Sequence, residues 1–229
     1  MAADITTRTP VLHDGDRMTR AEFLALWEQL PNVKRAELIG GVVHMPSPVS
    51  LDHAESEHDA AGWIFCYKVA TPGTAAGNNA TSILLDDAPQ ADVHLRILPE
   101  FGGKTWVENR LLHGPPELFV EARYSSEAHD LHVKAPLYEE AGVQEYLVIL
   151  LKRQEIRWHQ LVDGTYELLA PDADGIWRSR VFPGLWLNGQ AMLAGDAAQL
   201  TQTLQQGIAS DEHQRFVQKL AERKRKGTS

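Results

Sequence analysis

The sequence has little of what several classes of protein require. It holds a single cysteine, Cys66, among 229 residues, which excludes an internal disulfide framework and a cysteine-rich zinc site. Its longest unbroken apolar run, near Tyr146–Leu151, is far shorter than the roughly 20 residues that span a bilayer. The first ten residues, MAADITTRTP, hold charges of both signs and no apolar core, unlike a secretory signal. We therefore expect a cytoplasmic protein with no membrane segment.

Basic residues are also scarce. There are 22 Lys and Arg against 31 Asp and Glu, so the formal net charge is -9. That excess opposes non-specific affinity for phosphate backbones, so a nucleic-acid partner would have to be met by a local patch. The simpler interpretation of the charge is that it keeps the chain in solution. A hydrophobic content of 43% fits a globular protein, with one domain and an appendage or one large domain.

Apolar spacing and capping signals predict a mixed order of helices and strands. Thr19 and Glu22 form a capping box before a helix over about 19–30, and Gly40-Gly41 suggests a hairpin over 34–45. Ser50 caps a helix reaching about Val69, whose predicted buried stripe includes Ala54, Ala61, Ile64, Phe65 and Val69. We predict further strands over 82–85, 91–98, 117–123, 145–151, 155–161, 165–169 and 177–182. Helices follow residue 123 as far as Gly142, and cover 190–208 and 211–226; residues 99–116 read as a loop with one short strand at 105–107.

This order indicates a mixed α/β (α+β) fold, with a mixed central β-sheet flanked by helices. We divide the chain into a flexible lead (1–17), a main domain (18–187) and a C-terminal helical extension (188–229). Phe216 and Leu220, four residues apart in the extension, predict a face that docks on the domain or on a second subunit in a homodimer. The basic residues of 215–226 favour a solvated terminal helix, with contact to nucleic acid as the alternative.

Three acidic residues stand in apolar sequence. In the strand over 117–123, alternation turns Glu121 and Arg123 to one face and the apolar Leu118, Val120 and Ala122 to the other. An ionised carboxylate there is costly unless it is paired or bound to metal. Glu121 and Arg123 lie about 7 Å apart along the strand and could share one site, or form an ion pair at a sheet edge. Asp92 and Glu37 have similar settings, and for both the alternative is an exposed surface residue.

Other polar residues give weaker signals. Asp130 and Lys134 are four apart and would pair on one helix face, with Tyr138 a turn further on, although Pro136 disturbs such a helix. His53 and His58 flank two glutamates, but their spacing of five separates them by about 140° on a helix. A zinc site of the HExxH type needs two histidines four apart on one face, so we set that interpretation aside.

The ordered combination of these segments resembles the Uma2 family, formerly a domain of unknown function (DUF820). The resemblance covers most of 19–187 and is carried by five pieces: 35–48 (RAELIGGVVHMPSP) with His53, 116–121 (PELFVE), Ser125-Ser126, Asp130 with Lys134 and Tyr138, and 141–146 (AGVQEY). The segment 181–187 (VFPGLWL) is similar to a C-terminal segment of some members.

The resemblance implies a PD-(D/E)XK endonuclease-like domain over 18–187, with a restriction-endonuclease-like core. By position, Glu37 matches the first acidic residue, Asp92 the aspartate of the "PD" element, Glu121 the acid of the "(D/E)XK" element, and Lys134 a downstream lysine. The implied ligands of Mg²⁺ or Mn²⁺ are Asp92, Glu121 and the Ala122 carbonyl. Asp92 and Glu121 should then lie within about 4–5 Å of each other on one face. His53, Asp130 and Tyr138 are implied substrate contacts.

The implied activity is metal-assisted hydrolysis of phosphodiester bonds in nucleic acid, with DNA as the expected substrate. The sequence departs from the family at three places: Ala91 replaces a proline, Gly40 stands where an Asp is common, and Arg123 holds the place of the superfamily's lysine. The first two changes remove no ligand. The third leaves open whether Arg123 or Lys134 is the catalytic cation, and an arginine cannot serve as a general base. Two alternatives stay open, a catalytically inactive binding or regulatory module of the same fold and a homo-oligomeric structural protein.

Overall fold

The computed structural model describes residues 11–45, 48–123 and 130–227, without the side chains of Asp130 and Leu131. The helices are α1 (Arg20–Glu28), α2 (Leu51–Ala70), the 3₁₀ turn η1 (Pro99–Phe101), the π-helical turn η2 (Asp130–Lys134), α4 (Ala135–Ala141), α5 (Gly189–Ala194), α6 (Ala197–Ile208) and α7 (Asp211–Gly227). The strands are β1 (Glu37–Ile39), β2 (Val42–His44), β3 (Thr74–Asn78), β4 (Ser82–Ile83), β5 (Val93–Ile97), β6 (Trp106–Glu108), β7 (Leu111–His113), β8 (Leu118–Arg123), β9 (Glu145–Leu150), β10 (Glu155–Val162), β11 (Thr165–Leu169), β12 (Ile176–Arg178) and β13 (Trp186–Asn188). No helix of these residues combines the length and the apolar content needed to cross a membrane.

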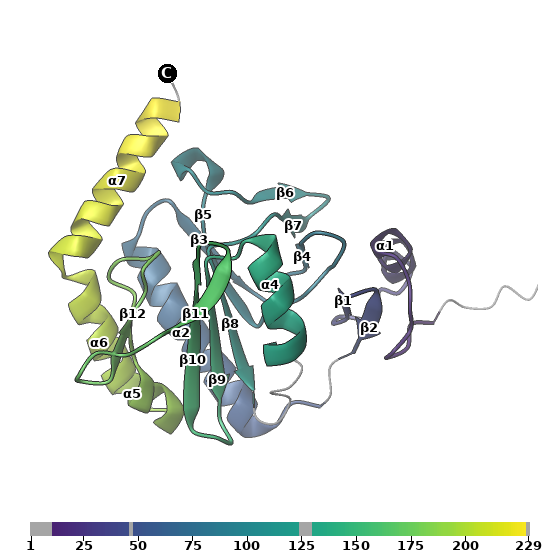
Figure 1. The fold of residues 1–229 in the computed structure, drawn as a ribbon, viewed down its shortest axis with the longest axis horizontal. Coiled ribbons are helices and arrows are strands. Elements are labelled where there is room, and N and C mark those ends of the chain that lie inside the picture. Colours follow the sequence, from purple (N-terminus) through teal and green to yellow (C-terminus); the bar gives the residue numbers. More distant parts are fainter. Residues whose placement is uncertain (1–10, 46–47, 124–129, 228–229) are drawn as a thin grey trace, which may run out of the picture.

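A six-stranded sheet in the order β11-β10-β9-β8-β5-β3 forms the centre of the molecule. Only β8 and β9 pair in parallel, joined through η2 and α4, while the other neighbours pair antiparallel. The predicted mixed sheet flanked by helices is therefore confirmed. Figure 1 shows α4 on one face of this sheet and α2 on the other, with α5, α6 and α7 beyond α2.

The sheet is buried on both faces, because each face carries its own apolar cluster. The face toward α2 includes the side chains predicted to point inward, with Leu118, Val120 and Ala122 from β8 and Val93, Leu95 and Ile97 from β5. The face toward α4 is filled by Phe119, Tyr138, Tyr146 and Val148. β8 also has a paired strand on each side, β9 and β5, so the interpretation of Glu121 and Arg123 as a pair at a sheet edge is wrong.

The N-terminal hairpin and α1 form a third apolar cluster beside the sheet (Figure 1). The predicted capping box at the start of α1 is present, with Thr19 and Glu22 bonded to each other's backbone. The predicted lead overlaps this unit, because Leu12 is buried in its cluster and Gly15 N–H donates to the Val43 carbonyl (2.9 Å). The flexible lead predicted for 1–17 is thus wrong for its last residues.

The second predicted helix has the expected cap at Ser50 but a different buried face. Its inward residues are Ser56, Ala60, Trp63, Ile64 and Tyr67. Phe65 and Val69, predicted to be buried, are 58% and 64% exposed. The apolar residues on this helix cover more than one face, so periodicity identified Ile64 correctly but assigned Phe65 and Val69 to the wrong face.

The C-terminal part differs from the prediction in its divisions. The helix expected over 190–208 is two helices, because Gly195 adopts a left-handed conformation (φ 68°) and Asp196 caps α6 through Gln199 N–H. Leu200, Leu204 and Leu220 belong to the same cluster as the sheet. The helices after residue 188 therefore complete the main core, and are not a separate extension of it.

Candidate active site

The strand register brings Asp92 and Glu121 together. β5 and β8 pair antiparallel with Val93 opposite Val120, so one more step of the register places Asp92 opposite Glu121. Opposed residues of an antiparallel pair project to the same face of the sheet. Both side chains are almost entirely buried. The two carboxylates therefore lie next to each other on one face, as the sequence predicts.

The guanidinium of Arg123 lies between these two acids. Its Nη1 donates to Asp92 Oδ2 at 2.7 Å and to the Ala122 carbonyl at 3.0 Å, and its Nη2 contacts Glu121 Oε2. The backbone N–H of Ala122 also donates to Asp92 Oδ2 at 2.9 Å. The three oxygen donors expected to hold a metal ion thus surround one cationic group. That donor set fits a hard divalent cation, which would have to take the place of the guanidinium.

Lys134, the last residue of η2 and the one directly before α4, also contributes to the site. Its ammonium, which has no exposed surface, contacts Glu121 Oε1 at 2.7 Å and Glu37 Oε1 at 2.8 Å. Glu37 Oε1 in turn accepts a hydrogen bond from Gln90 N–H at 2.6 Å. The hairpin, the segment before β5, β8 and η2 are therefore tied together by one ammonium and two carboxylates. All five residues predicted to be catalytic lie in this network.

The electrostatic setting favours the ionised form of Asp92. Burial by itself would raise the pKa of Asp92, but Arg123 and Lys134, with the Ala122 N–H, outweigh that cost and hold its pKa below the usual range. A carboxylate that stays ionised in a buried site is suited to binding a metal ion or positioning a cation.

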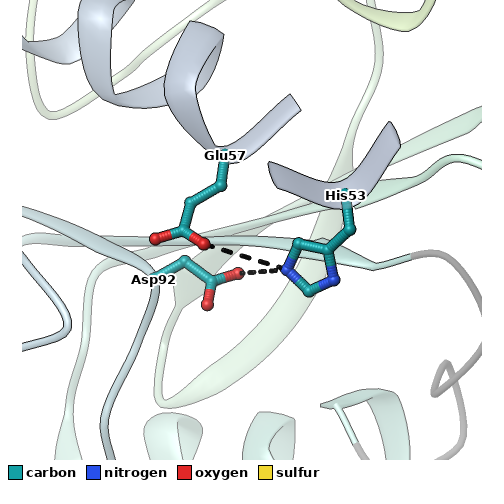
Figure 2. A group of neighbouring side chains, drawn as sticks. All are labelled: His53, Glu57 and Asp92. Atoms are coloured by element: carbon teal, nitrogen blue, oxygen red, sulfur yellow. Dashed lines mark ion pairs between the residues drawn. The ribbon is translucent and has the colours of Figure 1, made fainter. Parts of the chain in front are cut away.

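His53, a predicted substrate contact, lies near the start of α2 and close to Asp92. Its Nε2 is 3.9 Å from Asp92 Oδ2 and 4.0 Å from Glu57 Oε2, and Figure 2 shows the ring turned toward both carboxylates. Glu57 is held by Asn79 Nδ2 (2.8 Å) and lies 3.6 Å from Arg35 Nη2. Sequence reasoning missed Glu57. The signal was present, because His53 and Glu57 have the i, i+4 spacing that the pair His53 and His58 lacks.

The other two predicted substrate contacts are Tyr138 and Asp130. Tyr138 is fully buried between Phe119 and Tyr146, with ring centroids 4.5 and 4.9 Å away, so substrate cannot reach it and that prediction is wrong. Tyr138 instead points into the apolar cluster between α4 and the sheet. Asp130 is described only in its backbone, and Ser125 and Ser126 lie outside the described residues.

The comparisons with known proteins agree with this architecture. A solved structure described as a putative nuclease belonging to DUF820 from Anabaena variabilis superposes with a TM-score of 0.60 at 17% sequence identity, covering 77% of this chain and 99% of that one. At that identity the likeness shows the fold alone. No curated protein matches the chain. The family model for Uma2, described as "Putative restriction endonuclease", matches residues 20–190, so the chain belongs to the Uma2 family.

Proposed function

We propose that the protein is a metal-dependent endonuclease that hydrolyses phosphodiester bonds in DNA. The observation that carries the proposal is the arrangement of Asp92, Glu121 and the Ala122 carbonyl around a single cationic group. Family membership supports a nuclease-like function, and the metal requirement and the DNA substrate are our inference.

Asp92, Glu121 and Ala122 would hold a Mg²⁺ or Mn²⁺ ion. Bound there, such an ion would polarise a phosphate and lower the pKa of a bound water. The chain's own groups supply the rest. The carboxylates keep their position because Lys134 holds Glu121 and Ala122 N–H holds Asp92. Preorganised charges of this kind favour a transition state in which negative charge grows on the phosphate.

We assign different tasks to the two cations. Lys134 has no exposed surface and is shared between Glu121 and Glu37, which suits a positioning residue. Arg123 retains 13% exposure of its side chain and stands at the last residue of β8. A planar guanidinium can contact a phosphate through two donors, so Arg123 is the cation that we expect to meet the substrate.

The same geometry favours one competing function. Because Arg123 and Lys134 already neutralise the carboxylates, the site could serve a non-catalytic module that binds nucleic acid. The two functions differ in whether a bond is broken.

A cleavage assay separates them. Single-stranded and double-stranded DNA are incubated with Mg²⁺ or Mn²⁺, with EDTA as the metal-free control, and wild type is compared with Asp92→Asn. We expect cleavage that needs the metal and is lost in the variant. DNA binding without cleavage under every condition would support the non-catalytic module, and equal cleavage by both proteins would remove Asp92 from the site.

A further inference from the structure

A cavity of about 510 Å³ lies between α7 and the end of β5 that is farther from Asp92. It shares no lining residue with the network around Arg123. Glu117, which lines the cavity, precedes Glu121 by four residues, or about 14 Å along an extended strand. Cavities that hold small ligands have volumes of roughly 300–1,000 Å³. The cavity is therefore a candidate ligand site that is separate from the candidate active site.

The lining of this cavity has an excess of positive charge. Its four cationic side chains are those of Lys104, Arg180, Lys219 and Arg223. All four residues are exposed, and within the described part of the chain none has an ion pair or a side-chain hydrogen bond. The one carboxylate of the lining is Glu117, which is buried and accepts from Ile97 N–H at 2.7 Å. The lining thus carries three more positive than negative formal charges, although the chain has a net charge of -9. Such a site attracts anions, and arginine and lysine pair well with phosphate groups.

The elements that carry the cations are held in place by other contacts. Leu220 anchors α7, because it has no exposed surface and belongs to the main core. Arg223 lies against Gly102, directly after η1, where a Cβ would be 3.3 Å from the arginine Cδ. The backbone N–H of Arg180 donates to the buried Glu145 Oε1 at 2.7 Å. These elements are therefore positioned before a ligand arrives, which lowers the entropic cost of binding.

The rest of the lining suits a flat ring with a polar edge. Phe216 and Val181 are partly buried apolar residues that pack against the main core. Gln144 and Gln160 add two side-chain amides that have no hydrogen-bond partner among the described residues. Each amide offers two donors and one acceptor oxygen. A nucleobase has the matching chemistry, since its face stacks on aromatic side chains and its edge forms hydrogen bonds.

We propose that this cavity binds a nucleotide that carries at least two phosphate groups. The cations would contact the phosphates, while Phe216 and the two amides would contact the base. A guanidinium can reach a phosphate through two N–H donors, so we expect the two arginines to contribute more than the lysines. A terminal phosphate carries about 1.5–2 negative charges at pH 7, so a second phosphate brings the ligand close to the excess of three. The inference goes beyond the proposed function, because it concerns another part of the molecule and no bond is broken.

Isothermal titration calorimetry on the metal-free full-length protein in EDTA tests this inference, with adenosine diphosphate as the probe. We expect saturable binding to wild type that weakens about tenfold or more in Arg180→Gln and in Arg223→Gln, because each variant loses charge-assisted hydrogen bonds. Both side chains are exposed, so the two variants should keep the wild-type melting temperature. Arg225→Gln makes the same charge change on α7 outside the lining, and should bind as wild type does.

Further arms separate the parts and the source of the ligand. Gln160→Leu should weaken binding of adenosine diphosphate by about threefold but leave binding of inorganic pyrophosphate unchanged. Competition by a short single-stranded oligonucleotide would place the end of a strand in the cavity, and its failure to compete would leave the free nucleotide as the ligand.

Three results would overturn the inference. The first is no binding of adenosine diphosphate to wild type, and the second is equal affinity for adenosine diphosphate and pyrophosphate. The third is loss of binding in Asp92→Asn, which would move the ligand to the candidate active site. Binding that persists in Asp92→Asn supports the separate cavity whether or not the wild-type protein cleaves DNA, so failure of the proposed function leaves this test intact.

Discussion

Lys134 is the residue on which the buried charges of the site depend. Its replacement by methionine would leave Glu121 and Glu37 without their ammonium partner, and Glu121 has no exposed surface. Removing one partner of a buried ion pair destabilises a protein by about 3–5 kcal/mol, because the remaining charge stays buried. We expect Lys134→Met to lower the free energy of unfolding by that amount, measured by urea denaturation.

A double variant checks the cause of this loss. Adding Glu121→Gln removes the carboxylate that lost its ammonium partner, so the double variant should be less destabilised than the sum of the two single variants by at least about 1 kcal/mol. Strict additivity would show that Lys134 acts through packing of its aliphatic chain and not through its charge.

Glu145 provides a pH-dependent test away from the site. It is fully buried at the start of β9 and accepts hydrogen bonds from Ser179 Oγ (2.7 Å) and from Arg180 N–H (2.7 Å). Burial raises its pKa from 4.5 to about 6 despite these bonds. The folded state therefore binds a proton more tightly than the unfolded state. Its stabilising contribution is complete below pH 4.5 and is lost as the pH rises through about 6.

Glutamine at position 145 removes this titration while keeping the shape of the side chain. Between pH 4.5 and pH 7, Glu145→Gln should gain up to about 2 kcal/mol of unfolding free energy relative to wild type. Urea denaturation across this range measures it, with the exposed Glu167→Gln as the control that should follow wild type. A constant difference between Glu145→Gln and wild type would contradict the raised pKa.

At the residue scale, alternation in β8 made Glu121 a candidate but left an ordinary ion pair with Arg123 open, and the resemblance joined it to Asp92, Glu37 and Lys134. Alternation could not show that Arg123 faces both acids, because that contact depends on the pairing of β5 with β8. Glu57 was missed for a different reason. The two histidines five residues apart give the more familiar motif, whereas the carboxylate that shares a helix face with His53 is four residues after it.

Gly207 in α6 and Gly62 in α2 differ in the space that surrounds them, so the same substitution should have opposite effects on stability. A Cβ on Gly207 in α6 would lie 2.2 Å from the Gly184 carbonyl oxygen, whereas a Cβ on Gly62 in α2 would meet nothing within 4 Å. Alanine normally stabilises a helix interior relative to glycine by about 0.5–1 kcal/mol. We expect that gain for Gly62→Ala but a loss of about 1–3 kcal/mol for Gly207→Ala, because the contacted atom is backbone.

Thermal unfolding of the two variants beside wild type measures this contrast. The melting temperature should rise for Gly62→Ala and fall for Gly207→Ala. A rise in both would show that α6 does not pack closely on the turn at Gly184.

At the element scale, the helices with clear caps and the hairpins with glycine turns were predicted well. β3 was missed, since its sequence TAAGN has no apolar alternation. The position of β3 is set by its pairing with β5. Gly77 of β3 leaves room for the His94 ring of β5, since a Cβ at position 77 would lie only 2.8 Å from that ring. The division between α5 and α6 was also missed, because Gly195 can be tolerated inside a helix and only the fold reveals the left-handed turn there.

For the whole molecule, the site depends on segments that local pattern cannot connect. The hairpin contributes Glu37, η2 contributes Lys134 and the centre of the sheet contributes Glu121, and these meet only in the folded chain. The net charge of -9 also has a consequence at this scale. Any attraction to DNA must be local, so binding should weaken as salt screens it.

The most direct test of the nuclease site compares two glutamates of one strand. Glu121 and Glu117 are both buried on β8 or directly before it, but Glu117 bonds to Ile97 N–H (2.7 Å), at the opposite end of β5 from Asp92. Single-turnover DNA cleavage with Mn²⁺ should fall about 100-fold or more in Glu121→Gln and stay within about threefold of wild type in Glu117→Gln. Cleavage by Glu121→Gln at the wild-type rate, or an equal loss in both variants, would contradict the assignment of Glu121 to a catalytic site.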